Sequence, residues 1–90
     1  MELSEIRKKI DKLDEELVRI IAKRIALIPD VANYKKENNI PRYNPERENE
    51  VIEEKRKLAK ELNINPDLIE DLFKRIIEEA HRIEKEIIGK

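Results

Sequence analysis

The chain lacks the residues on which several common kinds of protein depend. It contains no cysteine, which excludes a disulfide framework and a zinc site built from thiolates. Its only histidine, His81, excludes the usual metal sites built from several histidines. No apolar run is long enough to cross a membrane, and residues 1–5 do not form a signal-peptide pattern. We therefore expect a cytoplasmic protein with no metal site and no contact with a membrane.

A charge excess of one sign is also missing. Charged residues make up 46% of the chain, yet 20 basic and 21 acidic residues leave a net charge of −1. A nucleic-acid-binding protein of this size normally carries a basic face, and single-strand binding also needs aromatic side chains on which bases stack. The chain has only two tyrosines and one phenylalanine. We therefore expect no nucleic-acid partner, and most of the charges are typical of solvated helix faces.

With one glycine and abundant Ala, Leu, Ile, Glu, Lys and Arg, the sequence favours helices over strands. Apolar residues recur at helical spacing over residues 4–38, 45–62 and 66–88. The second and third segments each begin with Asn-Pro, at residues 44–45 and 65–66, a cap followed by proline in the first turn. Pro29 lies inside the first segment and removes a backbone hydrogen bond, so we expect a kink there. Residues 1–90 are predicted to form one all-α domain of three helices.

The first predicted helix is too long for a globule made by this chain alone. A helix of about 35 residues extends roughly 50 Å, whereas a compact chain of this length has a diameter of roughly 30 Å. The apolar side chains at its start, among them Leu3, Ile6, Ile10 and Leu13, follow a heptad pattern and would stay exposed in a monomer. We therefore expect an intertwined homodimer formed by the long helices.

Charged residues interrupt the apolar faces at a few positions. Arg24 occupies a heptad seam position, and Lys35 lies eleven residues later on nearly the same face. Glu84 is surrounded by isoleucines on the last helix, and Arg47 lies in the first turn of the second helix. Such cations can extend to the helix edge or pair with acids such as Glu48. Alternatively, they converge on a pocket for a small dicarboxylate or phosphate.

The positions of these charges resemble a known family. Residues 6–14, Arg24, Lys35 and the pair Arg47-Glu48 follow one another as in the AroQ-class chorismate mutases. Residues 41–48 are similar to that family's loop and second-helix start, and residues 73–84 to part of its third helix. The resemblance covers essentially the whole chain. It implies conversion of chorismate to prephenate by a Claisen rearrangement in phenylalanine and tyrosine biosynthesis, without metal or cofactor.

The resemblance also implies roles for individual residues. Arg24 and an Arg7 supplied by the other subunit would bind the carboxylates of the substrate. Lys35 and Glu84 would donate hydrogen bonds to its ether oxygen. The further substrate-binding positions implied are Arg47, Glu48, Asn44, Val31, Ile77 and Ala80. Arg7 lies about 100° around the helix from Arg24, which fits its delivery across the dimer.

Four residues depart from the family pattern, one of which is Pro29, unexpected inside the first helix. Glu84 replaces a glutamine that is common in relatives, and only a protonated carboxyl group can donate a hydrogen bond. Asn44 replaces an aspartate that is often found in relatives, and Ala80 replaces a serine. Two secondary substrate contacts are therefore either lost or made by the backbone.

Two other functions compete with the mutase. An isochorismate pyruvate lyase shares the fold and much of the cationic pocket. A non-catalytic helical dimerisation module would instead pair Arg24 and Lys35 internally with acids and leave no cavity between the helices.

Overall fold

The structure is a computed structural model that describes residues 1–89, and over that range it contains three helices and no strand. The helices are α1 (Leu3–Glu37), α2 (Pro45–Glu61) and α3 (Pro66–Ile88). They confirm the predicted all-α fold with its long N-terminal helix. Within the same range, no helix is long and apolar enough to cross a membrane.

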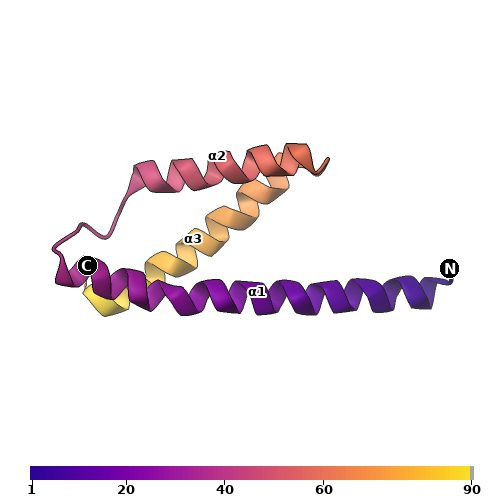
Figure 1. The fold of residues 1–90 in the computed structure, drawn as a ribbon, viewed down its shortest axis with the longest axis horizontal. Helices are drawn as coiled ribbons and strands as arrows, with labels where there is room; N and C mark the ends of the chain where they lie inside the picture. The colour runs from indigo at the N-terminus through magenta and orange to yellow at the C-terminus, as the bar shows by residue number, and fades with distance from the viewer. Residues whose placement is uncertain (90) are drawn as a thin grey trace.

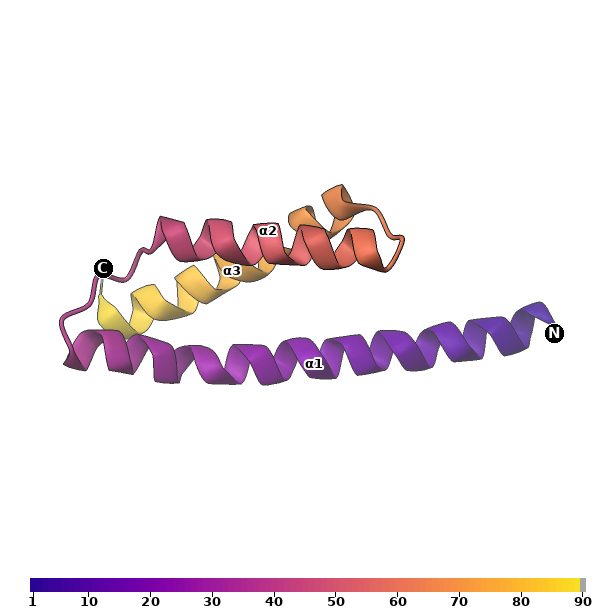
Figure 2. The same ribbon diagram turned by 45° about the horizontal axis from the view of Figure 1, so that its top comes forward.

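The three helices form an open, elongated arrangement. α3 crosses between α1 and α2 and contacts both, whereas α1 and α2 are not in backbone contact anywhere in residues 1–89. Figure 2 shows the same order from another side and shows that the N-terminal part of α1 extends beyond the other two helices. The molecule measures 56 × 23 × 14 Å. The C-terminal half of α1 is therefore the part that lies beside the other two helices (Figure 1, Figure 2).

Pro29 does not end the first helix. α1 is one continuous helix that includes Pro29 and ends at Glu37, and both ribbon views show it without interruption. A proline removes one backbone hydrogen bond, but the residues on either side still form theirs. As a result, residues on both sides of Pro29 present side chains from the same helix.

Asparagine takes the place of glycine at the two corners between helices. Asn39 and Asn63 have positive φ angles of 55° and 58°, a conformation that asparagine tolerates better than most residues. At the first corner the Ile40 N–H donates to the Lys35 carbonyl over 2.9 Å, and at the second the Ile64 N–H donates to Ala59 over 3.0 Å. These Schellman-type bonds turn the chain back sharply. The first corner directs residues 40–44 towards Lys35.

The starts of α2 and α3 are capped as the Asn-Pro pairs predict. The Asn44 side chain accepts a hydrogen bond from the Arg47 N–H at 3.1 Å, and the Asn65 side chain accepts one from the Asp67 N–H at 2.9 Å. Each cap satisfies a backbone donor that would otherwise lack a partner. The start of α2, which carries several predicted site residues, is therefore fixed by its own sequence.

Arg56 of α2 ties that helix to the start of α3. Its Nη1 lies 2.9 Å from Asp67 Oδ1 and 3.1 Å from Glu70 Oε1. Lys74 Nζ lies 2.6 Å from the other oxygen of Glu70. The hydrogen bond from Lys74, together with the charges of Lys74 and Arg56, lowers the pKa of Glu70 below its usual 4.5. Glu70 is therefore more strongly bound by these cations in its charged form.

Replacing Glu70 with Gln is expected to lower the melting temperature by a few degrees at most at neutral pH. A carboxylate whose pKa is lowered by folding stabilises the fold above its unfolded pKa and loses that effect as the pH falls. The difference between wild type and Glu70→Gln should therefore shrink below pH 4.5. Melting curves from pH 7 to pH 3 test this, with Glu53→Gln at an exposed position of α2 as the control. A difference that persists unchanged at pH 3 would contradict the assignment.

Candidate active site

A cavity of about 230 Å³ lies where the three helices and the segment after α1 meet. It is lined by Arg24, Ile28, Val31, Lys35, Arg42, Asn44, Arg47, Glu48, Val51, Ile77, Ala80, His81 and Glu84. Larger hollows lie on the outer surface of residues 39–43 and of α3, but they are lined mainly by exposed side chains. The cavity between the helices contains all the predicted site residues except Arg7.

Lys35 is held at two points in this cavity. Its Nζ donates to Glu84 Oε1 at 2.9 Å and to the Arg42 carbonyl oxygen at 2.7 Å. The Lys35 side chain is 18% exposed and that of Glu84 only 8%. An ammonium group has three N–H donors, so residues 1–89 occupy two of them by these bonds. The third can donate to an acceptor in the cavity from a fixed position.

Two charged groups in the cavity have a buried atom without a hydrogen-bond partner among residues 1–89. These atoms are Arg24 Nη1 and Glu48 Oε2. Burying a polar atom of a charged group without a partner is costly, and a ligand that supplies the missing bond removes that cost. Arg24 requires an acceptor such as a carboxylate, and Glu48 requires a donor such as a hydroxyl group. A dimerisation module whose cations are all paired and which has no cavity does not fit this arrangement.

Asn44 and Arg47 line the same cavity but are already engaged in α2. The side-chain oxygen of Asn44 is the cap acceptor described above. Arg47 Nη1 lies 2.8 Å from Glu50 Oε1, and both side chains are exposed. A surface pair of this kind contributes little and breaks readily. Arg47 is therefore free to turn towards an anion at the rim of the cavity, whereas Asn44 acts first as a helix cap.

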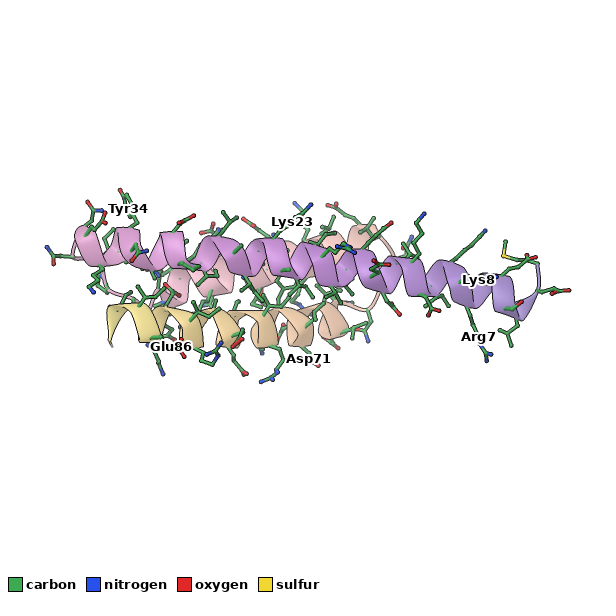
Figure 3. The ribbon with its side chains drawn as sticks, turned by 90° about the horizontal axis from the view of Figure 1, so that it is seen from below. Arg7, Lys8, Lys23, Tyr34, Asp71 and Glu86 are labelled. Carbon is green, nitrogen blue, oxygen red and sulfur yellow. The ribbon has the colours of Figure 1, made fainter. Side chains whose placement is uncertain are left out.

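Arg7 lies far from the cavity in the same chain. It is 17 residues before Arg24 on one helix, which corresponds to about 25 Å along the axis. Figure 3 shows Arg7 on the part of α1 that extends beyond α2 and α3, at the end opposite Tyr34. Its side chain is exposed. The Arg7 of one chain therefore does not reach the cavity of that chain.

The cavity also contains residues that the sequence analysis did not select. Ile28 and Val51 add apolar surface, and Arg42 and His81 add polar groups. His81 Nε2 lies 3.1 Å from Glu48 Oε1, and the Arg42 guanidinium contacts the other ring nitrogen of His81. The sequence could have indicated His81. It follows Ile77 by four residues and precedes Glu84 by three, so it lies on the same helix face as these two predicted site residues.

Comparison with known proteins shows one family over most of the chain. The family described as chorismate mutase type II matches residues 6–85. A chorismate mutase of Methanocaldococcus jannaschii is 38% identical over 86 residues, covering 96% of this chain and 87% of its own length. A T-protein of Enterobacter agglomerans is 38% identical over 85 residues, covering 94% of this chain. A bifunctional chorismate mutase/prephenate dehydratase of Aquifex aeolicus is 35% identical over 89 residues, covering 96% of this chain. The chain spans 23% of the length of that T-protein and 25% of that bifunctional enzyme.

Proposed function

Because the chain belongs to the chorismate mutase type II family, we propose that its cavity binds chorismate and rearranges it to prephenate. In this reaction the ether carbon–oxygen bond breaks as a carbon–carbon bond forms within one molecule. The protein exchanges neither protons nor electrons with the substrate. Its tasks are to fold the enolpyruvyl side chain over the ring and to stabilise negative charge that develops on the ether oxygen.

The observation that carries the proposal is that Arg24 and Lys35 line one cavity, Arg24 with an N–H that lacks an acceptor and Lys35 with two acceptors already in place. Arg24 has a buried N–H without a partner in residues 1–89, which matches a carboxylate of the substrate. Lys35 is already fixed by Glu84 and by the Arg42 carbonyl, so its remaining donor is preorganised for the ether oxygen. Arg47 adds positive charge at the rim for the second carboxylate. An anionic, ether-containing ligand satisfies both cations.

The other side of the ligand is matched by Glu48 and apolar side chains. Glu48 Oε2 is buried and accepts no hydrogen bond from residues 1–89, so it is suited to the ring hydroxyl of chorismate. Val31, Ile77 and Ala80 supply apolar surface against the carbon framework. Together these groups restrict the substrate to the compact conformation that reacts.

We further propose that the active molecule is a homodimer. The radius of gyration is 16.4 Å, against about 12 Å for a compact chain of 90 residues. The accessible surface is 7348 Å², against about 5,500 Å² for a compact monomer, an excess of roughly 1,800 Å². An excess of this size matches what one subunit of an obligate dimer buries. Among residues 1–89 the only buried apolar side chains are Ala32, Val51 and Ala59, so one chain alone has almost no core.

The second copy would also complete the active site. A row of exposed apolar side chains follows the N-terminal half of α1, including Leu3, Ile10 and Leu17. We propose that the two long helices pair over that row in antiparallel orientation, so that the N-terminal segment of each chain reaches the cavity of the other. The partner subunit's Arg7 then supplies a further guanidinium for the substrate carboxylates, in addition to Arg24 and Arg47.

Glu84 has two roles in this proposal. Its carboxylate accepts from Lys35 and fixes that ammonium group. Only the protonated carboxyl can add a second donor to the ether oxygen. Glu84→Gln keeps an oxygen that accepts from Lys35 and adds an N–H that donates, so its kcat for chorismate is expected to be at least that of the wild type. Measuring kcat of the two purified proteins at neutral pH tests this. A kcat of Glu84→Gln far below that of the wild type would contradict a donor role at this position.

The test of the proposed function is an assay of the purified full chain with chorismate and, separately, isochorismate. Formation of prephenate from chorismate is the expected result. Release of pyruvate from isochorismate without prephenate formation would replace the mutase by a lyase. No turnover of either substrate by a folded dimer would contradict an enzymatic function.

A further inference from the structure

The two oxygens of Glu48 have different surroundings. Oε1 lies 3.1 Å from His81 Nε2, whereas Oε2 is buried and has no hydrogen-bond partner among residues 1–89. The side chains of Glu48 and His81 are 29% and 23% exposed, so both are shielded from bulk water. One oxygen thus contacts His81, and the other has no partner among the described residues, in a side chain that lines the cavity together with His81.

The hydrogen on the His81 ring can be placed from its neighbours. The Arg42 guanidinium is in hydrogen-bond contact with His81 Nδ1. A guanidinium group can only donate, so Nδ1 must accept and carries no hydrogen. The ring hydrogen is then on Nε2, the nitrogen that lies 3.1 Å from Glu48 Oε1. Arg42 therefore selects the tautomer that holds Glu48.

The ring of His81 is also fixed by packing. Tyr43 lies against it with a centroid separation of 5.8 Å and an interplanar angle of 58°, within the range of favourable aromatic contacts. Arg42, next to Tyr43, holds Lys35 through its backbone carbonyl. The short segment after α1 therefore sets the positions of groups at two parts of the cavity, Lys35 directly and Glu48 through His81.

We propose that His81 is a positioning residue that fixes Glu48 so that Oε2 receives a ring hydroxyl group of the substrate. This inference rests on the proposed function for the identity of that hydroxyl. His81 does not touch the reacting atoms. It acts on recognition of the hydroxyl, because a Glu48 without the contact to His81 can rotate or lose its orientation. The consequence is specificity for substrates that carry the hydroxyl group.

Two substitutions of similar size separate this role from simple packing. Gln places an amide N–H near the position of the histidine Nε2, whereas Leu fills space without a donor. His81→Leu is expected to lower kcat/KM for chorismate roughly tenfold to a hundredfold, the effect of losing a hydrogen bond to a charged group. His81→Gln should retain most of the wild-type kcat/KM. Melting curves of both variants show whether the fold is kept.

The decisive readout is a chorismate analogue whose ring hydroxyl is replaced by hydrogen, measured as a competitive inhibitor. Its inhibition constant should change by no more than about twofold between wild type and His81→Leu, because it makes no bond to Glu48. Equal loss of chorismate and analogue would show a merely structural role and overturn the inference. Unchanged kcat/KM for chorismate in His81→Leu would also overturn it. Failure of the wild type to convert chorismate would instead contradict the proposed function.

The tautomer can be tested without any substrate. His81 is the only histidine, so the ring nitrogen signals of the ¹⁵N-labelled chain need no assignment. We expect a protonated Nε2 and an unprotonated Nδ1 in the wild type at neutral pH. A proton on Nδ1 would contradict donation from His81 to Glu48, whatever the enzymatic result.

Discussion

Lys35→Met is expected to lower kcat for chorismate about a hundredfold to a thousandfold, the effect of removing one preorganised donor from a developing negative charge. Methionine keeps most of the length and apolar volume of lysine but has no N–H. In the structure Lys35 Nζ is held by Glu84 Oε1 and by the Arg42 carbonyl before any substrate binds. The ammonium group therefore needs little reorganisation during the reaction. Its removal should reduce kcat more than it raises KM, because the bond is strongest in the transition state.

Loss of the cation also leaves Glu84 buried without its partner, which is destabilising by itself. The double variant Lys35→Met, Glu84→Gln removes that charge and is expected to recover stability but not activity. Lys36→Met is the matched control, because Lys36 is adjacent on α1 and exposed. It should keep wild-type kcat. A folded Lys35→Met dimer with kcat within a few-fold of wild type would contradict the role of Lys35.

The sequence predicted the helices well because their signals are local. The Asn44-Pro45 and Asn65-Pro66 pairs mark helix starts through contacts within a few residues, and the structure places the helices where these pairs indicate. The cations at seam positions were recognised because a charge on an apolar face is locally anomalous. A common pocket was one of the two alternatives that these charges left open, and the resemblance favoured it, because no local pattern brings the three helices together.

What the sequence did not indicate depends on contacts between distant residues. The role of His81 had no local signal, since Glu48 and Arg42, which it contacts, lie more than 30 residues away along the chain. An acid such as Glu48 was considered as a partner for Lys35, but the pair that forms is Lys35 with Glu84, 49 residues apart. The left-handed conformation of Asn39, which brings residues 40–44 back towards Lys35, is likewise fixed by the whole fold.

Mixing two inactive variants is expected to restore activity if the partner subunit's Arg7 completes each site. Arg7→Ala removes a guanidinium from the site of the other chain, and Arg24→Ala removes one from its own. Each homodimer lacks one guanidinium at both sites and should lose at least a hundredfold in kcat/KM. Arg24→Ala should lower the melting temperature only through the lost packing of the side-chain stem, because Arg24 Nη1 has no partner within residues 1–89.

A mixed dimer of these two variants contains one intact site and one that lacks both guanidinium groups. Random exchange of subunits makes about half the dimers mixed, so an equal mixture should reach about a quarter of wild-type activity. An equal mixture of Lys35→Met and Arg24→Ala is the control, since both residues line the cavity of one chain and no intact site can form. Recovery in the first mixture but not in the second requires that Arg7 acts across the dimer. One long helix cannot place its own Arg7 and Arg24 on the same ligand, so a role for Arg7 requires the other chain. No recovery of activity in the first mixture, despite proven subunit exchange, would therefore exclude a role for Arg7 in the site.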